Sequence, residues 1–177
     1  MLYETDYQLW VNDTVTELRA RNFENLDLEN LIAEVESLGR SQKHAISSYL
    51  MGLCEHLLKI QYWESERELC LRGWKLEVRN FRLQLQEELA ASPSLTSFLG
   101  DVFGKQYKNG RNLFLDASDL SGKEIPEEPD FTLEQALDEG WLPWQPKYFF
   151  AVFFFCVLCP MPALRTSDNQ KGGGQLR

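Results

Sequence analysis

The stretch LENLIAEVESLG, residues 28–39, carries the pattern on which the fold prediction rests. Asp27 precedes it and can cap a helix by accepting hydrogen bonds from unpaired backbone N–H groups. Gly39 can end the helix, because glycine tolerates the left-handed backbone found at helix ends. Between these two residues the apolar side chains recur at the spacing of one helical face: Leu28, Leu31, Ile32, Val35 and Leu38. The stretch therefore predicts a capped amphipathic helix that ends at Gly39.

Helices of the same periodicity are predicted on both sides of this stretch. One covers about residues 5–21, and another opens at Ser41 with an apolar stripe that runs from Ile46 to Ile60. A polar connection over 64–68 is expected to separate it from a helix whose stripe is formed by Trp74, Val78, Phe81, Leu85 and Leu89.

The remaining helices are predicted from helix start and stop signals. Pro93 suits the first turn of a fifth helix over 93–117, and residues 118–131 are expected to form a loop. Thr132 and Gln135 form a capping box that opens a short helix to Glu139. Strand signals are nearly absent before residue 148. The predicted class is all-α, a bundle of four to five main helices with a short C-terminal helix.

Composition limits the classes of protein that the chain can belong to. With 177 residues and 44% hydrophobic residues it is long enough for one domain with a core. The net charge of −9 opposes non-specific binding to nucleic acid, which needs clustered cations. The first ten residues have neither the basic nor the apolar region of a secretory signal, and the four cysteines form no zinc or redox motif. A cytoplasmic protein is expected.

A C-terminal segment differs sharply from the rest. Residues 148–164, YFFAVFFFCVLCPMPAL, carry no charge, and a polar, glycine-rich stretch follows them. Their length lies at the lower limit for a membrane-spanning helix, and Pro160 and Pro162 disfavour a helix at their end. The segment could be a short membrane tail, a final core helix, or a stretch outside the evolved domain, such as a shifted reading frame. The last interpretation is favoured, because the segment lacks an amphipathic period.

One polar cluster is a candidate for chemistry: Glu34, Glu36 and His56. The two glutamates lie about 200° apart around their helix, so they cannot chelate one ion from the same side. A short connection at Gly39 and Arg40 predicts antiparallel packing of the two helices, which would let His56 approach one glutamate. An imidazole beside a carboxylate can act as a general base, a metal-ligand pair or a structural hydrogen bond.

The cluster therefore gives three catalytic candidates, Glu34, Glu36 and His56, and two metal-ligand candidates, Glu36 and His56. In the alternative interpretation, His56 is a half-buried structural residue and the glutamates are solvated. No cofactor-binding residue is identified, and the cofactor is undetermined. The chain lacks the nucleophile-elbow, phosphate-loop and dinucleotide-binding motifs.

A basic group on the fourth predicted helix suggests a nucleic-acid surface with an aromatic anchor. Trp74 lies on the apolar stripe, however, so it is expected to be buried rather than to stack on a base. The cations around it are expected to flank the helix and to pair with Glu77, Glu87 or Glu88: Arg72, Lys75, Arg79 and Arg82.

Several short strings stand out along the chain, in this order: YETDY with Trp10 (3–10), LDLENL (26–31), EVESLGRS (34–41), HLLK (56–59) with Tyr62, SPSL (92–95), FTLEQ (131–135) and WLP (141–143). Together they resemble the domain of unknown function 29 family of small, mainly cyanobacterial proteins. The resemblance implies an all-helical fold and no established activity. Family chains end near the equivalent of Pro143, so the expected domain is 3–143, with 144–177 outside it.

Two functions are carried forward. The first is a non-enzymatic interaction or regulatory module that binds a protein partner or itself through an exposed helix face. The alternative is a metal-assisted hydrolase or nuclease that uses Glu34, Glu36 and His56. A tail-anchored membrane protein ranks below both, because only the borderline stretch 148–164 suggests membrane contact.

Overall fold

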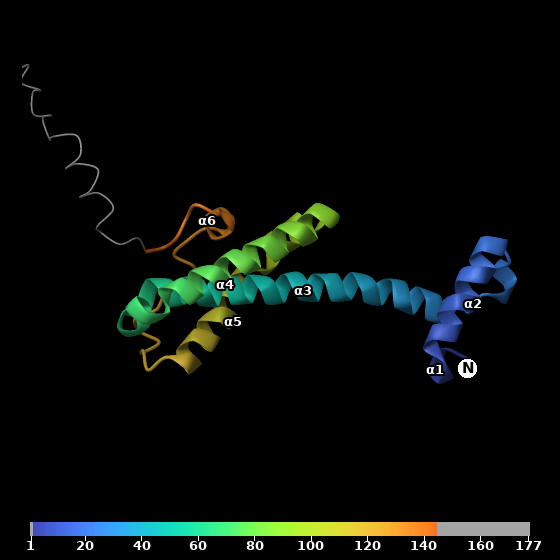
Figure 1. The fold of residues 1–177 in the computed structure, drawn as a ribbon, viewed down its shortest axis with the longest axis horizontal. Helices are drawn as coiled ribbons and strands as arrows, with labels where there is room; N and C mark the ends of the chain where they lie inside the picture. Colours follow the sequence, from blue (N-terminus) through green and yellow to red (C-terminus); the bar gives the residue numbers. More distant parts are fainter. Residues whose placement is uncertain (1, 145–177) are drawn as a thin grey trace, which may run out of the picture. The chain divides into compact units, whose positions relative to one another are not determined.

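The computed structural model describes residues 2–144, and within this range it contains helices and loops but no strand. The predicted all-α class is confirmed. The predictions for the segment after Trp144 lie outside the described residues. In chain order (Figure 1), the elements are α1 (Leu2–Thr5), α2 (Tyr7–Ala20), the 3-10 turn η1 (Phe23–Asn25), α3 (Leu28–Tyr62), α4 (Glu64–Ala91), α5 (Leu95–Ala117) and α6 (Leu133–Leu137).

The α3 helix runs without interruption for 35 residues, so the prediction that it ends at Gly39 is wrong. Its start is as predicted, because the Asp27 carboxylate accepts a hydrogen bond from Asn30 N at 3.4 Å. A Cβ at Gly39 would meet nothing within 4 Å, so no neighbour requires glycine there. A helical glycine costs about 1 kcal/mol relative to alanine. That cost is small beside the burial of the apolar stripe farther along the same helix.

The core forms around the second half of α3, which packs against α4 on one side and α5 on another (Figure 1). Seven apolar side chains of α3 are buried there: Ile46, Leu50, Leu53, Cys54, Leu57, Leu58 and Ile60. They meet Val78 and Leu85 of α4 and Leu99, Tyr107 and Phe114 of α5. The predicted stripes of the third and fourth helices thus supply the centre of the core.

Two glycines allow the three core helices to approach closely. A Cβ at Gly52 would lie 2.5 Å from the Phe81 ring of α4. A Cβ at Gly110 of α5 would lie 2.7 Å from the backbone oxygen of Met51 on α3. Because backbone atoms cannot move aside as a flexible side chain can, Gly110 sets the distance between α5 and α3.

Other predicted boundaries are partly confirmed. The polar connection over 64–68 is wrong, because α4 already begins at Glu64 and the chain reverses at Trp63 alone. Glu64 and Glu66 instead occupy the first turn, where acidic side chains interact favourably with the helix dipole. The capping box is present as predicted: Thr132 Oγ1 accepts from Gln135 N at 3.2 Å, and Gln135 Oε1 accepts from Thr132 N at 2.9 Å.

Arginines of α4 and α5 hold the loop and α6 against the core. Arg111 donates to the carbonyl oxygen of Ile125. Arg82 is only 3% exposed and donates to Ala136 O at 2.8 Å and Trp141 O at 2.9 Å. The prediction that Arg82 flanks the helix and pairs with a glutamate is therefore wrong. Burial lowers the pKa of this guanidinium, and the carboxylates of Asp138 and Glu139, which follow α6, oppose that shift.

Candidate functional site

Glu34 connects the N-terminal helices to α3. Its carboxylate accepts hydrogen bonds from Tyr3 OH of α1 at 2.6 Å and from Tyr7 OH of α2 at 3.1 Å. These bonds, and the negative charge beside the phenols, raise the pKa of both tyrosines. Both oxygens of Glu34 are thus engaged in linking α1 and α2 to α3.

The other two predicted site residues have different surroundings. Glu36 is exposed and forms an ion pair with Arg40 one turn away, at 3.3 Å. His56 is half-buried, with Nδ1 2.9 Å from the Gly52 carbonyl oxygen and its ring 5.6 Å from that of Phe81. The histidine therefore lies at the α3–α4 contact, and the glutamate faces solvent.

The structure does not bring His56 to either glutamate within one chain. All three residues lie on the uninterrupted α3 helix, and His56 is more than twenty positions beyond Glu34 in the numbering. At 1.5 Å of rise per residue, the separation along the axis is roughly 30 Å. The facing-helix arrangement on which the site prediction relied is wrong, because α3 does not turn at Gly39. A catalytic or metal-binding role for these residues stays a prediction without that geometric basis.

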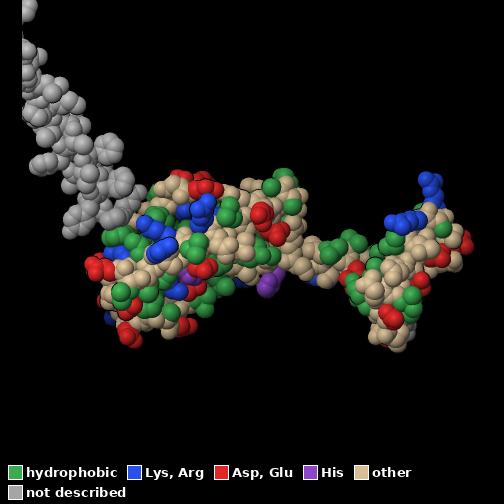
Figure 2. Space-filling model, in the orientation of Figure 1, with side chains coloured by type: hydrophobic (Ala, Val, Ile, Leu, Met, Phe, Trp, Pro, Cys, Tyr) green, Lys and Arg blue, Asp and Glu red, His purple; other side chains and the backbone are tan. Residues whose placement is uncertain are grey.

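The first half of α3 presents an apolar face that the fold leaves open. The exposed fractions of its apolar residues are 52% for Leu28, 58% for Ile32, 61% for Val35 and 70% for Leu38. Figure 2 shows hydrophobic side chains at the surface along this part of α3. Four such residues at helical spacing differ from the single exposed leucines that are normal on any surface.

The α2 helix adds a second exposed apolar group. Only Trp10 and Thr14 are buried in this helix. Leu9, Val15 and Leu18 each remain more than one third exposed. These side chains of α2 are a second exposed apolar group beside that of α3 in the chain order. Helical spacing alone does not distinguish the exposed stripe of α3 from the buried stripe of the same helix.

A family model matches residues 2–142 and carries the description "domain of unknown function DUF29". This chain belongs to the DUF29 family. No curated protein and no solved structure matches it. The match shows family membership, as the order of the sequence strings suggested, and the description names no activity.

The DUF29 match includes both exposed apolar groups and the predicted site. Glu34, Glu36 and His56 all lie in the matched range, as do α2 and the first half of α3. In the part of the chain that the structure describes, no group of three or more His, Cys, Asp or Glu side chains is arranged to hold a metal ion. None of the described helices combines the length and apolar character needed to cross a membrane.

Proposed function

We propose that this DUF29 chain is a helical interaction module that associates with a second copy of itself through the first half of α3. The proposal is supported by the exposed face of Leu28, Ile32, Val35 and Leu38. In solution such a face exposes apolar surface to water, and burying it against another apolar face is favourable. The same helix buries the equivalent stripe in its second half, against α4 and α5.

A second copy is favoured because the face is complementary to itself when two α3 helices run antiparallel. In the register that sets Ile32 of one chain opposite Val35 of the other, Leu28 lies beside Leu38. A two-fold symmetric pair repeats each of these contacts twice, as isologous interfaces do.

The size of the face sets the expected strength. Covering the exposed part of a leucine, isoleucine or valine contributes about 1 kcal/mol, so the eight side chains of a pair contribute roughly 8 kcal/mol. Association costs an estimated 4 to 15 kcal/mol in lost translational and rotational freedom, so α3 alone supports a dissociation constant of about 1 mM at best. Covering Leu9, Val15 and Leu18 of α2 as well adds roughly 6 kcal/mol per pair on the same basis, which brings the dissociation constant into the micromolar range.

Sedimentation equilibrium of the full chain from about 1 to about 200 μM tests the proposal, since a dimer stabilised by both α3 and α2 forms within this range. The wild type is expected to shift from monomer toward dimer as the concentration rises. Ile32→Lys and Val35→Lys should each remain monomeric, because the register places the new cation opposite an apolar side chain of the other copy, where burying an unpaired charge is unfavourable.

Leu76→Lys is the matched control, since it places the same charge on α4 at a leucine that is 66% exposed. It should dimerise as the wild type does, and circular dichroism should show all variants to be folded. A wild type that is monomeric throughout would overturn the proposal. Dimerisation lost in Leu76→Lys but kept in Ile32→Lys would move the interface to α4 and equally overturn it.

A further inference from the structure

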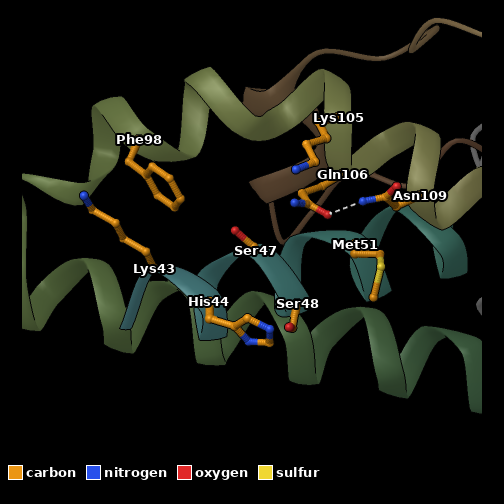
Figure 3. Close-up of a pocket in the computed structure, with 9 residues that line it drawn as sticks. All are labelled: Lys43, His44, Ser47, Ser48, Met51, Phe98, Lys105, Gln106 and Asn109. Carbon is orange, nitrogen blue, oxygen red and sulfur yellow. Dashed lines mark hydrogen bonds between the residues drawn. The ribbon is translucent and has the colours of Figure 1, made fainter. Parts of the chain in front are cut away.

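A pocket of about 490 Å³ lies between α3 and α5 (Figure 3), and it shares no lining residue with the exposed apolar face. Lys43 and Ser47 line it from α3, and Phe98, Lys105 and Gln106 line it from α5. No aspartate or glutamate is among its lining residues. In a chain with a net charge of −9, a pocket with two lysines and no carboxylate is an unusual local concentration of positive charge.

The two lysines of the pocket have no carboxylate partner among residues 2–144. Lys43 Nζ lies over the Phe98 ring, 5.5 Å from its centroid. Lys105 is exposed, and Figure 3 draws its ammonium group near the Gln106 amide and above Ser47. Their charges are therefore available to an anion that enters from solvent.

Gln106 gives the pocket a fixed neutral donor. Its side chain is buried, and its Oε1 accepts a hydrogen bond from Asn109 Nδ2 at 3.0 Å. This bond orients the Gln106 amide so that its NH2 group points away from Asn109. Within the described range that NH2 group donates to no protein acceptor, and Figure 3 shows it on the side of Lys105 and Ser47. A held amide N–H beside an ammonium favours an anionic oxygen.

We propose that this pocket binds a small organic anion. Its carboxylate or phosphate group lies between Lys105, the Gln106 NH2 group and the Ser47 hydroxyl, and its flat or apolar body rests against Phe98. The three donors directed at one space supply the charge recognition, and the aromatic ring supplies apolar contact, as in many small-molecule sites. The site is separate from the self-association face and does not depend on it.

Titration of the full ¹⁵N-labelled chain with phenyl phosphate, followed by NMR, tests this assignment. The side-chain NH2 signals of Gln106 should shift saturably. Inorganic phosphate, which lacks the ring, should bind more weakly, and benzyl alcohol, which lacks the charge, should leave these signals in place. If benzyl alcohol shifts them as far as phenyl phosphate does, the pocket is an apolar site and the proposal fails.

Lys105→Glu should weaken phenyl phosphate binding about tenfold or more, because it replaces an attractive charge by a repulsive one. Lys108→Glu is the matched control: it makes the same charge change on α5 at a lysine that instead pairs with Glu128 at 2.6 Å. The control should change the affinity by less than about twofold, since exposed charges away from the pocket are screened. Equal losses in both variants would show a general charge effect and overturn the site.

Discussion

The two halves of α3 carry the same apolar pattern and have opposite surroundings. From Ile46 to Ile60 the stripe is buried between α4 and α5. In the first half, Leu28, Ile32, Val35 and Leu38 of the stripe are each more than half exposed. The helix is continuous between them, so the difference comes from what packs beside each half rather than from helix geometry. Helical periodicity indicates that a helix has an apolar face whose burial is favourable, but not whether the same chain buries it.

The glycines of α3 repeat this contrast on a smaller scale. Gly52 lies in the buried half, where the Phe81 ring occupies the space that a side chain would need. Gly39 lies in the exposed half, with open space around its Cα. The same residue type is thus required by packing at one position and merely tolerated at the other.

The largest expected effect is the difference in stability between two variants, each with one leucine truncated in one half of α3. Leu57→Ala should destabilise the fold by about 2–5 kcal/mol, because it leaves a cavity in the core. Leu38→Ala should change the stability of the dilute monomer by less than about 0.5 kcal/mol, since that side chain is mostly solvated. Urea unfolding followed by circular dichroism at low concentration measures both, and equal losses would contradict the assignment of a buried and an open half.

The next effect concerns the close approach of α5 to the buried half. Gly110→Ala should cost about 1–3 kcal/mol, because the added methyl group would overlap the Met51 backbone oxygen and force the helices apart. Gly104→Ala on the same helix is the control, since a Cβ there would meet nothing within 4 Å. Thermal unfolding compares them. A Gly110→Ala protein as stable as the wild type would rule out the close contact.

A stabilising substitution distinguishes a continuous α3 helix from a helix that stops. Gly39→Ala should raise stability by about 0.5 to 1 kcal/mol, because alanine favours the helix and restricts the unfolded chain. If Gly39 instead ended a helix with a left-handed backbone, alanine would be strained there and stability would fall. The sign of the change in the free energy of unfolding decides between the two.

The smallest expected effect concerns the bond between α1 and α3. Tyr3→Phe removes the hydroxyl that donates to Glu34 at 2.6 Å, so α1 and α2 should open more readily with little change in the global free energy of unfolding. Hydrogen exchange in residues 2–20 should rise, while exchange in the core should not change. Faster exchange throughout the domain would mean that the N-terminal helices are more tightly coupled to the core than this contact suggests.

Local signals predicted much of the fold. The Asp27 cap and the Thr132–Gln135 capping box are contacts between residues near in sequence, so spacing alone reveals them. Gly39 and Glu64 misled the prediction, because whether a weak helix position continues depends on packing elsewhere. Burial of the stripe from Ile46 onward stabilises a helix that continues past Gly39. That contribution cannot be inferred from the residues next to Gly39.

The candidate site was harder to predict, because its determinants are long-range. The bonds from Tyr3 and Tyr7 to Glu34 join segments about thirty positions apart, and Arg82 binds carbonyl oxygens beyond α5. Helical spacing contains no information on such pairs. The pairing of His56 with a glutamate failed for the same reason, since it required a turn that sequence could suggest but not establish.

Hydrogen exchange by mass spectrometry at two protein concentrations tests most directly whether a second copy covers the first half of α3. Amides over 28–41 should exchange more slowly at about 200 μM than at about 1 μM, because association protects a helix that opens readily alone. Amides over 46–60 should be strongly protected at both concentrations. Exchange over 28–41 that is independent of concentration would contradict the proposed self-association.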